Sequence, residues 1–332
     1  MLTIDVLLPA HGDAPFISET ISSVLPQLSG HDKLIVICDR LSESAMKVLD
    51  DLASLDSRLQ YYKCEESGIV AALNFGIDKS VAQLIARIDS DDIMVEGRLD
   101  FQKEFLSLHP EYDLVGSQML LIDEFGNYLG STKYPRTHRG IKRKLTYQNA
   151  IGHPSTMFRR EAVLNVGGYR EDFQGAEDYD LWFRLVRCGK ARNLDFKFTK
   201  YRIGPHQYTK KLKGPRQRKL EGIIRIQNSA TKLGIGEFKI PSLKTMDYEQ
   251  ITILYKDLLV RMRFHSLVRA KRLKLIDEFI ELSDLGLHTK SMRSLLKFLF
   301  LILLFNPTFL FASFYRLIRK RLRVFSFNEM EK

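Results

Sequence analysis

The feature that most constrains this chain is Leu84–Asp92, with the sequence LIARIDSDD. Leu84–Ile88 is a short apolar run of the kind that forms a buried parallel strand, and Asp89, Ser90, Asp91 and Asp92 follow it directly. Ligands of open α/β sheets bind beyond the carboxyl ends of strands. Three crowded carboxylates repel one another unless a cation lies between them, and oxygen ligands favour Mg²⁺ or Mn²⁺. Such an ion would bind a diphosphate. The alternative is a solvated acidic turn that caps a helix beginning near Gly97.

The residues before and after this segment alternate between the strand and helix patterns. Strands are expected at Thr3–Pro9, Lys33–Cys38, Leu59–Lys63 and Leu84–Ile88, and helices at Pro15–Leu28, Ser44–Leu55 and Gly68–Ile77. This alternation predicts a parallel sheet wound by right-handed crossovers. Neither a GxGxxG sequence nor a P-loop is present, so a bound phosphate would need another partner. The acidic cluster with a metal ion supplies one.

The pattern changes along the rest of the chain. A helix is expected at Gly97–His109, a hairpin from Tyr112–Ile122 and Tyr128–Tyr134, and an amphipathic helix at Asp178–Cys188. Beyond about Pro205 the alternation ends, and helices are expected at Gln217–Leu233, Asp247–Leu282 and Ser291–Arg323. We therefore predict an α/β domain over residues 1–205, with halves at about 1–92 and 93–205. Residues 206–332 form a helical, basic and partly apolar extension.

The charge of the chain is concentrated in this extension. The formal net charge is +11, with dense basic runs at Lys210–Lys219 and Arg316–Arg323. These runs lack interleaved stacking aromatics, which argues against a nucleic-acid partner. Leu295–Tyr315 is apolar, but Lys297 and Asn306-Pro307 interrupt it, whereas a membrane span needs ~20 apolar residues. This pattern predicts attachment to an anionic membrane surface. The alternative is a helix packed on the catalytic domain or on a second subunit.

The N-terminus and the cysteines indicate the compartment. The first residues, MLTIDVLLPAHG, lack a basic segment followed by an apolar core, so no signal peptide is predicted. The three cysteines are widely spaced and form neither a disulfide framework nor a zinc pattern, which suggests a reducing environment. We expect a cytoplasmic protein, peripheral on the inner membrane.

Seven segments in order resemble the motifs of family 2 glycosyltransferases of the GT-A fold. They are LLPAHGDAPFISETISSVL, IVICDRLSES, GIVAALNFGI, ARIDSDD, HPSTMFRR, GGYRED and AEDYDLWFRL, within Thr3–Arg202. The pattern is most similar to that of bacterial enzymes that build capsule or O-antigen repeats. The resemblance implies a Rossmann-like, mostly parallel sheet flanked by helices.

The resemblance also implies roles on the donor side of the site. Asp89-Ser90-Asp91 matches the DxD motif, so Asp91 would bind the metal and Asp89 the metal or the ribose. Asp92 would cap the following turn. Asp39 would contact the uracil or ribose of a nucleotide-sugar, although Arg40 stands where the family usually has a second acid, and a helix cap is the alternative. His206 would reach the metal or phosphates, but it comes later after Tyr-Arg than the family histidine does. The other donor-binding residues implied are Pro9, Gly68, Asn74 and Glu177.

On the acceptor side, Glu177-Asp178 matches the acidic pair of the family, and Asp178 would be the general base. The alternative is that both acids complement a helix N-terminus. Asn74 also reads as a satisfied interior amide, His153 as a structural histidine, and Arg202 as a core residue that packs and pairs.

The resemblance implies an inverting enzyme that uses Mn²⁺ or Mg²⁺. It would transfer one sugar from a nucleotide-sugar, with a UDP-sugar expected, to a saccharide acceptor on a polyprenyl diphosphate. The QxxRW motif and the long membrane spans of processive relatives are absent from the sequence. The alternatives are a metal-dependent nucleotidyltransferase acting on sugar phosphates and a glycoside hydrolase.

Overall fold

The computed structural model describes residues 2–204, 215–232, 234 and 237–272. Contacts divide the chain into two compact units, of which the first comprises Met1–Asn228 with Ile240–Met246, and the second the remaining residues. The first unit thus extends beyond residue 205, where the domain boundary was predicted. A functional division of the chain at residue 205 stays a prediction. No helix of the described residues has the length and hydrophobicity needed to cross a membrane. His206 and Leu295–Tyr315 lie outside the described residues.

The first half of the sheet is parallel. Its strands are β1 (Ile4–Gly12), β2 (Lys33–Leu41), β3 (Leu59–Lys63) and β4 (Leu84–Arg87), in the spatial order β3-β2-β1-β4. Strand β1 runs beyond the predicted end at Pro9, because Ala10 and His11 continue the pairing with β2. The predicted end of this strand is therefore three residues too early.

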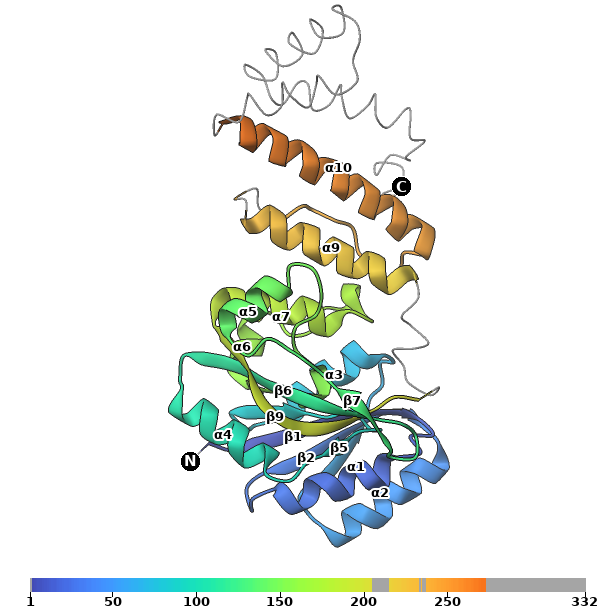
Figure 1. Ribbon diagram of the computed structural model, residues 1–332. Helices are drawn as coiled ribbons and strands as arrows, with labels where there is room; N and C mark the ends of the chain where they lie inside the picture. Colours follow the sequence, from blue (N-terminus) through green and yellow to red (C-terminus); the bar gives the residue numbers. More distant parts are fainter. Residues whose placement is uncertain (1, 205–214, 233, 235–236, 273–332) are drawn as a thin grey trace, which may run out of the picture. The chain divides into compact units, whose positions relative to one another are not determined.

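Helices cover both faces of this parallel part, as Figure 1 shows. Helices α1 (Ile17–Val24, followed by a 3₁₀ turn Leu25–Gln27) and α2 (Glu43–Leu55) lie on one face, where Val6 and Leu8 belong to the main apolar core. Helix α3 (Ile69–Lys79) lies on the other face. It approaches β1 so closely that a Cβ on Gly76 would lie 2.1 Å from Leu7 Cδ1. Alternate residues of the strands therefore feed two separate apolar layers.

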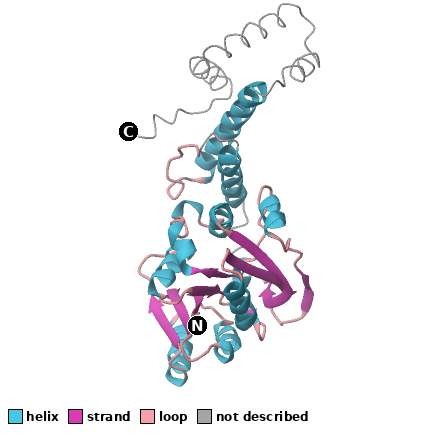
Figure 2. Ribbon diagram, turned by 90° about the vertical axis from the view of Figure 1, so that its left-hand side faces the viewer, coloured by secondary structure: helices cyan, strands magenta, loops and turns pink. Residues whose placement is uncertain are grey.

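The second half of the sheet is mixed. Strand β4 pairs antiparallel with β8 (Met157–Arg159), and the order continues through β6 (Tyr112–Ile122) and β9 (Lys190–Arg202) to β5 (Ile93–Met94). Strands β6 and β9 pair in parallel. Figure 2 shows the curved strands of the sheet with helices beside them. The predicted hairpin is confirmed, because β7 (Tyr128–Ser131) pairs antiparallel with β6. Strand β9 was not predicted.

The helices of this half are α4 (Arg98–Leu108), α5 (His138–Lys144), α6 (Arg160–Asn165) and α7 (Glu177–Cys188), with 3₁₀ turns at His153–Ser155 and Glu171–Phe173. Farther along the chain, α9 (Pro215–Lys232) and α10 (Tyr248–Arg272) confirm the helical character expected there. The expected α/β class, a sheet flanked by helices with a helical continuation, is confirmed.

A fully buried arginine at the start of α4 joins the two halves of the sheet. The Arg98 guanidinium donates to the carbonyl oxygens of Arg87 (2.7 Å), Pro154 (2.8 Å) and Thr156 (3.0 Å), and to Gln102 Oε1. Burial lowers the pKa of Arg98 to about 9, so it remains protonated at neutral pH. Backbone carbonyls thus satisfy a charge that would be costly to bury alone.

Candidate active site

The segment after β4 gathers three carboxylates. Ligand oxygens of Asp89, Asp91 and Asp92 all lie within 4.8 Å of one another. Burial, and then the charge of Asp89, raises the pKa of Asp91 to about 7, and the same two causes raise the pKa of Asp92. The apolar strand therefore delivers a crowded set of acids to the carboxyl end of the sheet, as predicted.

The alternative of a helix cap is wrong. Helix α4 begins at Arg98, and its N-cap residue Gly97 has no side-chain cap bond. The carboxylate of Asp92 is fully buried and accepts the backbone N–H of Arg202 at 2.9 Å. The capping role expected for Asp92 is wrong for the same reason, since its side chain binds β9 rather than the following turn.

The donor set of this cluster fits a hard divalent cation. All three residues offer oxygen ligands, and Asp92 Oδ2 is buried without a hydrogen-bond partner. Asp89 and Asp91 are partly exposed, so they are the two members open to a ligand. The acids fit Mg²⁺ or Mn²⁺ on these grounds, while the third expected ligand, His206, is not among the described residues.

Arg87 is a buried cation beneath the acids that the sequence did not single out. Its Nη2 pairs with Asp89 Oδ1 at 2.5 Å, whereas Nε and Nη1 are buried without hydrogen-bond partners. Its charge opposes the rise in the pKa of Asp91, Glu177 and Asp178, so it acts on both acidic groups. The sequence feature that could have identified Arg87 is the presence of an arginine in an otherwise apolar strand.

Three of the expected donor-binding residues, Pro9, Asp39 and Gly68, lie toward the ends of β1 and β2 and at the start of α3. Pro9 is buried in β1, and the buried Asp39 follows the core of β2. Asp39 Oδ2 accepts the N–H of Gly68 at 2.9 Å, so the structure brings these two residues together at the start of α3. Burial alone would raise the pKa of Asp39, but the bonds from Gly68 and Ser67 outweigh it and hold this pKa below its ordinary value. Asp39 is thus an ionised acceptor.

Gly68 is required for two reasons. Its φ is +120°, and a Cβ there would lie 2.5 Å from Gln174 Oε1. Glycine adopts this backbone conformation without strain, and any larger residue would also force the Gln174 side chain to shift. The start of α3 is therefore packed against the segment that leads into α7.

Asn74 has a clear positioning role. Its Nδ2 donates to Tyr169 O at 2.8 Å, and its Oδ1 accepts from Tyr169 N at 2.9 Å. These bonds fix the Gly167-Gly168-Tyr169 loop, where Gly168 has a φ of +65°. The reading of Asn74 as a satisfied amide agrees with these contacts, and the donor contact stays a prediction.

The acidic pair opens α7. Asp178 Oδ2 accepts from Asn149 Nδ2 at 2.6 Å and Oδ1 from Tyr179 N at 2.6 Å, so its carboxylate is oriented from both sides. Burial raises the pKa of Asp178 to about 6 despite these bonds. Glu177 accepts the N–H of Gly175, and burial followed by the charge of Asp178 raises its pKa to about 7. Asn149 carried no sequence signal for this contact.

His153 is structural. Its Nε2 lies 2.8 Å from Tyr169 Oη, and its ring packs edge-on against Trp182 at 5.6 Å between centroids. Burial, aided by the charge of Arg87, moves its pKa well below the ordinary value. A neutral, enclosed histidine agrees with the structural reading.

Comparison with known proteins places the chain in a family. A family model described as Glycosyl transferase family 2 matches residues 5–167. The O-antigen biosynthesis glycosyltransferase WbnJ of Escherichia coli is 34% identical over 205 residues, which are 60% of this chain and 79% of WbnJ. The UDP-Gal:alpha-D-GlcNAc-diphosphoundecaprenol beta-1,3-galactosyltransferase of Escherichia coli is 26% identical over 189 residues, 53% of this chain and 65% of that enzyme.

The fold has solved neighbours as well. The crystal structure of S. aureus TarS 1-349 in complex with UDP-GlcNAc matches with a TM-score of 0.56 at 13% identity, covering 83% of this chain and 77% of that one. At this identity the likeness concerns the fold alone. The extensive match to WbnJ carries the assignment: the chain belongs to glycosyltransferase family 2, and its sheet has the GT-A fold expected from the sequence.

Proposed function

We propose that this enzyme transfers one sugar from a UDP-sugar to a saccharide acceptor carried on a polyprenyl diphosphate, with inversion and with the help of Mn²⁺ or Mg²⁺. The observation that carries the proposal is the set of three carboxylates within 4.8 Å at the end of β4. The names of two relatives support the pathway class, since one acts in O-antigen biosynthesis and the other on a diphosphoundecaprenol-linked sugar. We therefore propose a role in surface polysaccharide biosynthesis.

The donor side of the site is built for a nucleoside diphosphate. Asp89 and Asp91 would hold the divalent ion, and Asp39 would accept a hydrogen bond from the uracil or the ribose. When bound, the ion neutralises charge on the departing diphosphate, which is worth several kcal/mol at the transition state. Pro9, Gly68 and Asn74 belong to the wall of the same donor site in this proposal.

The acceptor side carries the proton transfer. Asp178 takes the proton of the acceptor hydroxyl while the oxygen attacks the anomeric carbon from the face opposite the diphosphate. The new carbon–oxygen bond forms as the bond to the β-phosphate oxygen breaks, and UDP leaves. The pKa of about 6 supports this role, because the carboxylate is ionised at neutral pH yet basic enough to accept a proton. Glu177 beside it would orient the base or touch the donor sugar.

The proposed setting is the cytoplasmic face of the inner membrane. There the basic and apolar part of residues 206–332 would attach the enzyme to anionic lipid, where a polyprenyl-linked acceptor resides. This attachment follows from the sequence pattern of Leu295–Tyr315 and Arg316–Arg323.

The test is a screen of nucleotide-sugars with Mn²⁺, Mg²⁺ or EDTA, read out by thermal protection and by release of UDP. We expect protection by a UDP-sugar only when a divalent ion is present, and UDP release when a matching lipid-linked acceptor is added. Release of free sugar from an oligosaccharide without any nucleotide would support a glycoside hydrolase instead. Formation of pyrophosphate from a nucleoside triphosphate and a sugar phosphate would support a nucleotidyltransferase. Full transfer activity in excess EDTA would refute the metal requirement.

A further inference from the structure

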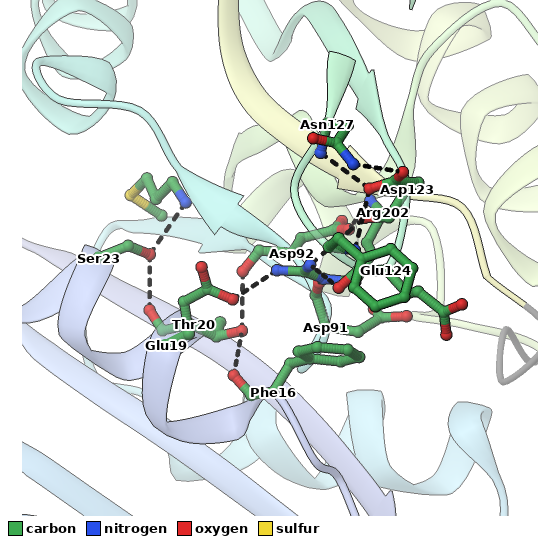
Figure 3. A network of polar contacts seen from close by, with 12 residues as sticks. Phe16, Glu19, Thr20, Ser23, Asp91, Asp92, Asp123, Glu124, Asn127 and Arg202 are labelled. Carbon is green, nitrogen blue, oxygen red and sulfur yellow. Dashed lines mark hydrogen bonds and ion pairs between the residues drawn. The ribbon is translucent and has the colours of Figure 1, made fainter. Parts of the chain in front are cut away.

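The last residue of β9, Arg202, is buried against the acidic segment. It is 3% exposed. Its backbone N–H donates to Asp92 Oδ1 at 2.9 Å, and its Nε donates to the carbonyl oxygen of Asp91 at 2.9 Å. Arg202 therefore contacts two consecutive residues of the carboxylate cluster, although it is more than a hundred positions away in sequence. Figure 3 shows this arrangement.

The other end of the same guanidinium is held by two further elements. Nη1 donates to the carbonyl oxygen of Glu124, at 3.0 Å, in the turn between β6 and β7. Nη2 pairs with Glu19 Oε2 of α1 at 2.5 Å, and the guanidinium lies 4.0 Å from the centre of the Phe16 ring. The planar group thus ties the acidic segment to α1 and to the hairpin (Figure 3).

These contacts determine the orientation of the Asp91 side chain. Because Nε holds the backbone carbonyl of Asp91, the Cα–Cβ bond of this residue has a fixed starting direction. The neighbouring Asp92 is held through its carboxylate, so the segment is fixed on both sides of the Asp91–Asp92 peptide bond. Lysine keeps the backbone bond to Asp92 but cannot replace the guanidinium contacts, since its ammonium is a single point with no fork of donors.

We propose that Arg202 is a positioning residue of the metal site: it sets the orientation of Asp91 without touching donor or metal. The inference rests on the proposed function, in which Asp91 holds the divalent ion. Groups that orient a metal ligand typically change metal affinity by about 10- to 100-fold when they are replaced. We expect a loss of this size for Arg202→Lys, which keeps the charge and removes the fork.

Arg159 provides a matched control. It is a partly buried arginine that, like Arg202, donates to backbone carbonyls, those of Tyr112 (3.0 Å) and Leu106 (2.6 Å). It lies at the opposite end of β4, paired with Leu84 rather than beside the acids. Arg159→Lys should therefore lower the melting temperature, as Arg202→Lys does, but leave the metal site unchanged.

The experiment measures UDP binding by calorimetry in the full chain, in saturating Mn²⁺ and in EDTA. We expect Arg202→Lys to weaken Mn²⁺-dependent UDP binding about 10- to 100-fold and to leave the binding in EDTA at the wild-type value, while Arg159→Lys changes neither. Equal Mn²⁺-dependent binding by Arg202→Lys and the wild type would overturn the inference. So would an equal loss in both arginine variants, because it would show a general effect of destabilisation.

Two further outcomes are decisive. If Arg202→Lys does not fold, Glu19→Gln replaces it, because Glu19 is half exposed and its loss removes only the outer ion pair of the guanidinium. Weaker Mn²⁺-dependent binding by Glu19→Gln supports the inference, and wild-type binding overturns it. If the wild-type chain itself shows no metal-dependent binding of UDP, the proposed function fails, and this inference fails with it.

Discussion

Replacement of Asp178 by asparagine separates the proposed base from the rest of the site. The asparagine keeps the size of the side chain but cannot accept a proton. A positioned general base contributes ~10²–10⁴-fold to the rate, so we expect kcat to fall by at least about 10²-fold. Binding of UDP in Mn²⁺ should stay at the wild-type value, because the base contacts the acceptor.

The contacts of Asp178 allow the stability of this variant to be worked out. The folded carboxylate has a pKa of about 6 instead of the ordinary 3.8, so keeping it ionised at pH 7 costs on the order of 3 kcal/mol. The asparagine removes this cost. It also has one acceptor oxygen for the two donors Tyr179 N and Asn149 Nδ2, and the lost bond costs ~1–3 kcal/mol. The two effects oppose each other, so the melting temperature should stay close to the wild-type value.

The pH dependence gives a second readout of the same group. A base with a pKa of about 6 must be ionised to act, so wild-type kcat should fall roughly tenfold for each pH unit below 6. The residual rate of Asp178→Asn should lack this limb. The assay is release of UDP from the donor identified in the screen, with the melting temperature as a control for folding. A variant that keeps kcat within a few-fold, or one that loses UDP binding and keeps kcat, would show that Asp178 is not the base.

Three further predictions concern the donor site and the C-terminal residues. Asp91→Asn should abolish Mn²⁺-dependent UDP binding in calorimetry with the melting temperature retained, and UDP binding that persists would remove Asp91 from the metal site. Gly68→Ala should lower the free energy of unfolding in urea by ~1–3 kcal/mol, since the new Cβ meets Gln174 at a φ of +120°. The control Gly30→Ala has open space around it and should be neutral. Equal effects of the two variants would show that the backbone at Gly68 is not strained by a side chain. Truncation after about Thr289 should release the protein from anionic vesicles in a flotation assay and leave nucleotide-sugar binding intact, and a truncated chain that still floats would place the membrane contact elsewhere.

The parts of the site that the sequence predicted are those with local signals. An apolar run followed by acids predicted β4 and the cluster Asp89–Asp92, and an amphipathic pattern predicted most of α7. The acidic pair Glu177 and Asp178 was implied only by the resemblance to the family. The hairpin could also be predicted from neighbouring residues, because its turn is stabilised locally: Asp123 accepts the N–H groups of Phe125 and Asn127.

The parts that were missed depend on contacts between distant segments. Strand β9 lacks a clean alternation, since exposed and buried residues follow one another irregularly along Lys190–Arg202 while its pairing with β6 shifts register. Arg87 and Arg98 are buried charges, which composition-based reasoning assigns to the surface. Arg98 donates to the carbonyl oxygens of Pro154 and Thr156, more than fifty residues away, so no window of neighbouring residues contains the reason for its burial.

The two halves of the sheet share the neighbouring strands β4 and β8, and Arg98 links the halves by hydrogen bonds. This arrangement affects how the chain folds. Strand β4 of the donor half needs β8 as its neighbour, and Arg98 needs the carbonyl oxygens of Pro154 and Thr156 before its charge can be enclosed. Neither half can complete its interior while the other is unfolded. The two halves therefore form one cooperative unit whose native pairings must close long loops, a topology that favours slow folding. A fragment that ends near residue 92 would expose β4 as an unpaired apolar edge, which is a site of aggregation rather than of nucleotide binding.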